Sequence, residues 1–150
     1  MTLGCVAALR IACLRLLLLG ALAAGVLGSA PARAQGGSIR GRIEDQLLRL
    51  EFGPLDELLT YEHNPSFKRF YRTHKFFLLA LTQQSEHQFD IFLKRCGNAT
   101  DYLDAQSRTP FRDALIAELY VEEALIHYLN NANLAAANAL RNAKKLTRKQ

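Results

Sequence analysis

From residue 39 onward, apolar side chains recur every three or four positions, which is the spacing of one face of a helix. No segment alternates apolar and polar residues as a half-buried strand does. The pattern predicts an all-α fold of antiparallel helix-turn-helix hairpins that form an irregular helical bundle. The repeating apolar positions include Ile39, Ile43, Leu47, Leu50, Phe67, Phe70, Tyr71, Phe77, Leu81, Phe89, Phe92, Leu115, Leu119 and Leu129.

Capping and turn residues set the expected ends of these helices. Gly53 and Pro54 stop the first helix, and Pro54 can open a short second one. Gly97 predicts the end of a later helix and leaves a long polar loop over residues 97–108. A polar residue followed by proline, or by Gln three positions later, predicts a helix start. Such pairs are Asn64 with Pro65, Ser85 with Gln88, and Thr109 with Pro110.

Residues 1–34 differ from the rest of the chain and predict a signal peptide. They hold three arginines and no acidic residue, and their apolar run covers residues 16–27. That run is shorter than the roughly 20 residues that span a bilayer, and small residues follow it up to Ala34. We expect cleavage between Ala34 and Gln35, and an exported bacterial protein of the periplasm or the extracellular space. The alternative is a retained membrane anchor.

Charge is unevenly distributed along the chain. The sequence carries 19 basic and 14 acidic residues, but residues 35–150 keep a net charge of only +2. Five of the basic residues lie in residues 141–150, so the remainder of the expected helical domain is acidic overall. Cations in a last turn complement the helix dipole, and we favour this interpretation over an anionic membrane or polymer as partner. We expect no nucleic-acid partner and no stable membrane span after cleavage.

Residues 67–77 interleave aromatic and basic side chains, a pattern that could bind a single nucleic-acid strand. At helical spacing the same residues separate into an apolar face and a basic face. We therefore favour ordinary core packing for this segment. His74 lies on the apolar face and is expected to be a core histidine rather than a catalytic base.

Two pairs of charged residues share a helix face at a spacing of four: Glu123 with His127, and Glu118 with Glu122. Helical metal sites use carboxylate and imidazole ligands at a related spacing, Glu-x-x-His on two helices. Here the Glu-to-His spacing is one residue longer, and the sequence has no second copy. We favour a solvent-facing Glu–His pair. No metal, no cofactor and no catalytic residue is expected.

Cys96 is the single cysteine that remains after residue 34. An odd thiol in an oxidising compartment has no internal partner, so it is either buried or available for an intermolecular disulfide. Burial is the interpretation we favour, because free cysteine is among the most buried residue types.

The end of the chain resembles one tetratricopeptide repeat. After a turn at Asn130 and Asn131, a last helix completes a hairpin over about residues 110–148. The resemblance rests on small and large residues at the positions where two helices of a repeat pack together. It implies a helical scaffold for protein–protein contact, of the kind found in exported bacterial repeat proteins, with no catalysis. The positions are Tyr120, Ala124, His127, Ala136, Leu140 and Ala143, with Glu123 at a position that is usually apolar.

One repeat alone is not expected to be stable, because about three repeats are needed to bury their faces on one another. The upstream helices could close the core, the chain could begin a longer repeat array, or the face of residues 134–146 could pair with a second copy. We expect an exported helical scaffold that contacts another protein, with self-association as one form of that contact. The alternative is a small exported helical bundle that binds a metal or a small ligand, either as a binding protein or as an enzyme.

Overall fold

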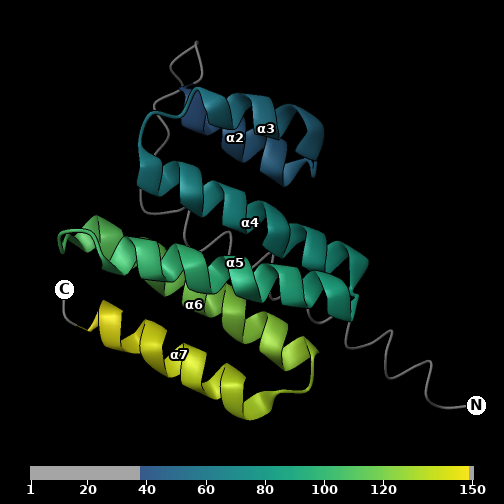
Figure 1. The fold of residues 1–150 in the computed structure, drawn as a ribbon, viewed down its shortest axis with the longest axis vertical. Coiled ribbons are helices and arrows are strands. Elements are labelled where there is room, and N and C mark those ends of the chain that lie inside the picture. The colour runs from purple at the N-terminus through teal and green to yellow at the C-terminus, as the bar shows by residue number, and fades with distance from the viewer. Residues whose placement is uncertain (1–37, 149–150) are drawn as a thin grey trace, which may run out of the picture. The chain divides into compact units, whose positions relative to one another are not determined.

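The computed structural model describes residues 38–148, so the predicted signal peptide and its cleavage point at Ala34 and Gln35 lie outside the described residues. The described part of the chain is helical and contains no strand, which confirms the predicted all-α fold (Figure 1). None of its helices is both long enough and apolar enough to cross a membrane. The helices are α2 (Ile39–Leu48), α3 (Phe52–Thr60), α4 (Pro65–Gln83), α5 (Glu86–Asp104), α6 (Pro110–Leu129) and α7 (Asn133–Thr147).

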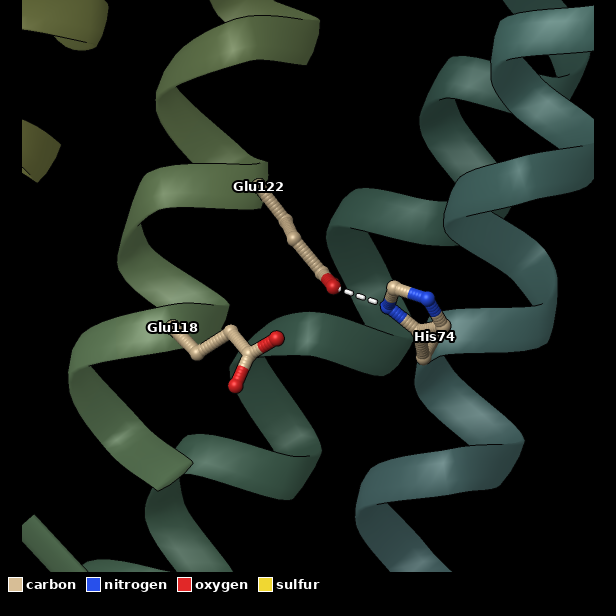
Figure 2. A group of neighbouring side chains, drawn as sticks. All are labelled: His74, Glu118 and Glu122. Atoms are coloured by element: carbon tan, nitrogen blue, oxygen red, sulfur yellow. Dashed lines mark hydrogen bonds and ion pairs between the residues drawn. The ribbon is translucent and has the colours of Figure 1, made fainter. Parts of the chain in front are cut away.

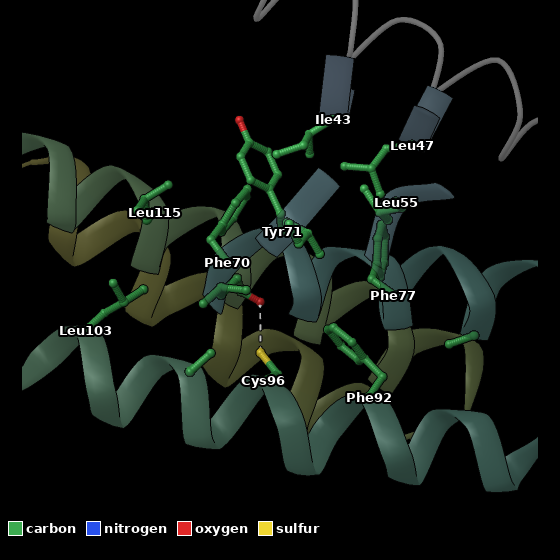
Figure 3. Close-up of a cluster of buried hydrophobic side chains, with 14 of the residues drawn as sticks. Ile43, Leu47, Leu55, Phe70, Tyr71, Phe77, Phe92, Cys96, Leu103 and Leu115 are labelled. Atoms are coloured by element: carbon green, nitrogen blue, oxygen red, sulfur yellow. Dashed lines mark hydrogen bonds between the residues drawn. The ribbon is translucent and has the colours of Figure 1, made fainter. Parts of the chain in front are cut away.

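Each helix packs against the next one in the sequence, and two longer-range contacts close the bundle. These are the contacts of α4 with α2 and with α6. Helices α2 to α6 contribute to one core of buried apolar side chains, part of which is drawn in Figure 3. The largest fully buried members are Phe92, Ile43, Leu55, Leu59, Leu103, Ile116, Leu119 and Ile126.

Helix α7 is attached differently, because it contacts α6 through small side chains. Its buried residues are all alanines, and α6 presents two buried alanines of its own. Small side chains let two helix backbones approach closely, but each buries little apolar surface. These residues are Ala117, Ala124, Ala136, Ala139 and Ala143.

The three predicted helix starts are confirmed by hydrogen bonds from the cap residues. The side chain of Asn64 accepts from the backbone N–H groups of Ser66 and Phe67, at 2.9 and 3.2 Å. Ser85 and Thr109 each accept one N–H from the first turn of α5 and α6. Local sequence determines these ends, because the cap and the amide that it satisfies lie within three residues.

The predicted end of a helix at Gly97 is wrong. Helix α5 continues to Asp104, and the long loop predicted over residues 97–108 shortens accordingly. The reason is burial: Ala99 and Leu103 continue the buried face that Phe92 begins. Glycine inside a helix costs about 1 kcal/mol relative to alanine, which this burial offsets.

The first helix also ends earlier than predicted. It stops at Leu48, and Gly53 and Pro54 fall in the first turn of α3 rather than at the end of α2. Leu50, expected on the apolar face, lies in the connection with a φ of 58° and is exposed. The chain must reverse here so that the buried side of α3, with Leu55, can reach the core.

Candidate metal centre

Three side chains from two helices meet where α4 packs against α6. His74 projects from α4, and Glu118 and Glu122 project from successive turns of α6 (Figure 2). One ligand atom of each residue lies within 4.8 Å of those of the other two. The spacing of four places both carboxylates on one face of α6, and the contact between the helices brings the imidazole to that face.

The His74 ring is held by its aromatic neighbours. It stacks near Phe70 with 5.9 Å between ring centroids, and it lies 5.7 Å from the ring of Phe77. Its Nδ1–H donates to Oε1 of Glu122. Burial alone would lower the pKa of His74, but the charge and hydrogen bond of Glu122, together with Glu118, raise it. The hydrogen bond and the charge of Glu122 therefore favour the charged form of the imidazole, and His74 and Glu122 form an ion pair when His74 is protonated.

Glu122 has an unsatisfied hydrogen-bonding atom. The residue is only 4% exposed, and while its Oε1 accepts from His74, its Oε2 has no hydrogen-bond partner among the described residues. A buried carboxylate oxygen without a donor costs free energy, so most such oxygens in folded proteins are satisfied. The unpartnered oxygen belongs to a side chain that extends from α6 toward His74, and it is available to a further donor or to a cation (Figure 2).

Glu118 forms the outer rim of the cluster. The residue is exposed, and its carboxylate accepts no hydrogen bond among residues 38–148. Partial desolvation and the charge of Glu122 raise the pKa of Glu118, and Glu44 on α2 adds a further negative charge nearby. Because the rim is exposed, the repulsion from Glu122 is the cause that the geometry supports most directly. Glu118 is therefore the side of the cluster that faces solvent.

One imidazole and two carboxylates form a mixed nitrogen and oxygen ligand set. Such a set suits divalent transition ions, whereas Ca²⁺ and Mg²⁺ prefer oxygen ligands alone. Three protein ligands leave at least one coordination position for water or for another molecule. A bound divalent cation would also neutralise the two adjacent carboxylates, which otherwise face only the single positive charge of a protonated His74.

The predicted Glu123–His127 pair is formed but takes no part in this cluster. Oε1 of Glu123 lies 3.5 Å from Nε2 of His127, and both side chains are partly exposed. The second pair, Glu118 and Glu122, had the same spacing in the sequence, and the structure supplies its imidazole from a different helix. The histidine expected to be a core residue is thus the one beside the carboxylates.

Cys96 lies inside the core, where its residue is 1% exposed. Its Sγ donates to the backbone oxygen of Leu119 at 3.5 Å (Figure 3). Burial, followed by the charges of Glu123 and Glu122, raises the pKa of the thiol. An intermolecular disulfide at Cys96 would require α5 to open away from α6.

We expect Cys96 to be unreactive in the folded protein, because the nucleophile is the thiolate and the thiol is both buried and protonated. With Cys5 and Cys13 replaced by serine, the remaining thiol should react with a chromogenic disulfide reagent only after denaturant is added. Native and denatured samples of the same variant provide the comparison. Equal rates in both samples would contradict the buried position.

The residues that carry the tetratricopeptide resemblance have different degrees of burial. Ala124, Ala136 and Ala143 are buried, and Tyr120 is half-buried. Leu140, expected to fill a groove between helices, is 52% exposed and fills none within the described residues. Membership of the repeat family therefore stays a prediction.

The chain matches no family model, no curated protein and no solved structure.

Proposed function

We propose that the protein binds a divalent transition-metal ion, taken here as Zn²⁺, through His74, Glu118 and Glu122. The observation that carries the proposal is the Glu122 carboxylate, buried with one oxygen on His74 and the other without a partner among the described residues. Zinc accepts histidine nitrogen and carboxylate oxygen together. This is the metal-binding form of the small helical bundle that the sequence left as an alternative.

Metal binding at this site is linked to protons. Imidazole coordinates only when it is neutral, so the ion must displace the proton that Glu122 holds on His74. Glu118, whose pKa is also raised, must be ionised to contribute. Metal affinity therefore rises with pH across the range in which these two groups lose their protons. The exposed rim at Glu118 gives the ion its route of entry.

The test is Zn²⁺ titration of chelator-treated protein by isothermal calorimetry. The wild type should bind one ion, and His74→Asn or Glu122→Gln should weaken binding by about a hundredfold or more, since loss of an outer-sphere partner alone costs 10–100-fold. Glu118→Gln should weaken binding less, because Glu118 lies at the rim. The matched control is the double variant Glu123→Gln with His127→Asn, which removes a neighbouring Glu–His pair and should bind as the wild type does.

Three outcomes would contradict the proposal. The wild type could show no binding, the three site variants could bind as tightly as the wild type, or the control could lose affinity to the same degree. Circular dichroism of each variant confirms that helix content is kept, so that a loss of binding reports on the ligands rather than on folding.

Protein contact is a second candidate function, favoured by apolar side chains that the last hairpin leaves exposed. Val121 and Tyr128 on α6 and Leu134 and Leu140 on α7 are each more than half exposed. We propose that the protein is exported and uses this hairpin as a scaffold for another protein or a second copy of itself. Light-scattering mass over a range of concentrations tests the self-association form.

A further inference from the structure

A groove between α4 and α5 is lined by basic side chains from both helices. Its volume is about 340 Å³, within the range of small-ligand pockets. Helix α4 contributes Lys68, Arg69 and Arg72, and α5 contributes Arg95. Within residues 38–148 no acidic residue lines the groove, and α4 has none along its whole length.

Two of the arginines are oriented by aromatic rings instead of by carboxylates. The guanidinium of Arg69 lies over the ring of Tyr102 at 4.2 Å, and that of Arg95 lies over the ring of Phe76 at 3.8 Å. Stacking fixes the plane of a guanidinium but does not use the N–H donors at its edge. Two planar donor groups are therefore held at the groove with their hydrogen-bonding edges available.

Four other arginines of the described residues have carboxylate partners, whereas Arg42, Arg141 and Arg148 have none. Arg40 pairs with Glu62 at 2.9 Å, and both Arg108 and Arg112 pair with Asp113. Among the described residues, the three groove arginines form no ion pair with an acid, and the lysine of the groove bonds to a backbone oxygen. Like charges on facing helices repel one another, so an anion between them would relieve that repulsion.

We propose that this groove binds a small ligand carrying two or more phosphate groups. Guanidinium groups bind phosphate through two parallel hydrogen bonds, and cations on both walls can each take one phosphate. Asn98, which also lines the groove, adds a neutral donor. The basic face that the sequence separated from the apolar face of residues 67–77 is thus one wall of the proposed site.

The groove is distinct from the metal centre. Arg72 and His74 are two positions apart on α4, and residues at that spacing point to different faces of a helix. Lys75, the remaining lysine of α4, does not line the groove. Its Nζ pairs instead with Asp56 at 2.6 Å. Removing metal should leave the anion site unchanged, so each site can be tested alone.

The experiment is titration of the full folded chain with tripolyphosphate at physiological ionic strength, where charges more than about 8 Å apart are largely screened. The double variant Arg69→Gln with Arg95→Gln should bind at least about tenfold more weakly than the wild type. The matched control is Arg141→Gln with Arg148→Gln, which removes the same net charge from α7 and its C-cap and should stay within about twofold. All substituted side chains are exposed, and circular dichroism verifies folding.

The same variants distinguish the source of the phosphate. Binding to cardiolipin vesicles, whose headgroup carries two phosphates, but not to phosphatidylcholine vesicles, supports the proposal with a lipid headgroup as ligand if it is lost in the groove variant. Tripolyphosphate binding without vesicle binding supports a soluble ligand. The proposal is overturned if the wild type does not bind tripolyphosphate, or if the control loses as much affinity as the groove variant. Groove-dependent binding of a single-stranded oligonucleotide without tripolyphosphate binding would overturn it in favour of a nucleic-acid strand.

Discussion

Replacing His74 with leucine is expected to lower the free energy of unfolding by about 3 kcal/mol at pH 7, because it leaves a buried carboxylate without its counter-charge. Glu122 is 4% exposed and has no other hydrogen-bond donor among the described residues. Urea denaturation in the presence of a chelator measures the difference without a contribution from metal. Removing one partner of a buried ion pair costs about 3–5 kcal/mol of stability, and we expect the low end of this range because the His74 side chain is 21% exposed.

The control for this prediction removes both charges. A double variant, His74→Leu with Glu122→Leu, should recover most of the lost stability, because apolar residues in place of a whole buried ion pair are often neutral or stabilising. If the single variant is as stable as the wild type, or the double variant is no better than the single one, the pair is not the buried interaction described above.

The contribution of the His74–Glu122 pair to the free energy of unfolding should also depend on pH. The folded state raises the pKa of His74 above its unfolded value of about 6.5, so its contribution is complete below that pH and is lost as pH rises through the folded pKa. The raised pKa of Glu118 acts in the same direction at lower pH. Asp113 acts oppositely, because the hydrogen bond from Arg112 lowers its pKa and its contribution is lost only in acid. Chelator-treated wild type should thus be less stable at pH 9 than at pH 6, while Zn²⁺ should stabilise it more at the higher pH.

Phe92→Ala is expected to lower the free energy of unfolding by about 3–5 kcal/mol, the range for a large aromatic side chain removed from a core. Phe92 is fully buried and lies 5.6 Å from the ring of Phe77, so it joins α4 to α5. A domain of this size has about 5–15 kcal/mol in total, so the variant should lose a large share of its stability. Urea denaturation followed by circular dichroism measures the change.

Leu134→Ala is the matched control for the core substitution. Leu134 is 77% exposed on α7, so its truncation should change the free energy of unfolding by no more than about 0.5 kcal/mol. A loss below about 1 kcal/mol for Phe92→Ala would mean that α4 and α5 do not share the core described above.

The sequence predicted those features of the fold that depend on neighbouring residues. The cap at Asn64 and the apolar face of α4 are of this kind, because a cap and its amides, or one face of a helix, involve positions within a few residues. The end of α5 was mispredicted at Gly97 because a local signal competed with burial of Leu103 against other helices. That burial depends on the packing of the whole bundle and has no local signature.

The candidate metal centre was only half visible in the sequence. The spacing of Glu118 and Glu122 could be read directly, whereas His74 lies 48 positions from Glu122 and meets it only through the packing of α4 on α6. The sequence did contain one indication of a buried partner for Glu122. Glu122 falls between Leu119 and Ile126 on the buried face of α6, and a carboxylate at such a position requires a buried partner.

The alanine contact between α6 and α7 has a consequence for how the protein opens. Each buried methyl group contributes about 0.8 kcal/mol, so the three buried alanines of α7, with the partly buried Leu146, hold it by less than the large buried side chains hold α4, α5 and α6. Local opening of α7 therefore requires less free energy than global unfolding, and its amides exchange with solvent by a separate, cheaper fluctuation. The proposed metal ligands and the basic groove lie on α4, α5 and α6, so we expect both sites to persist when α7 detaches.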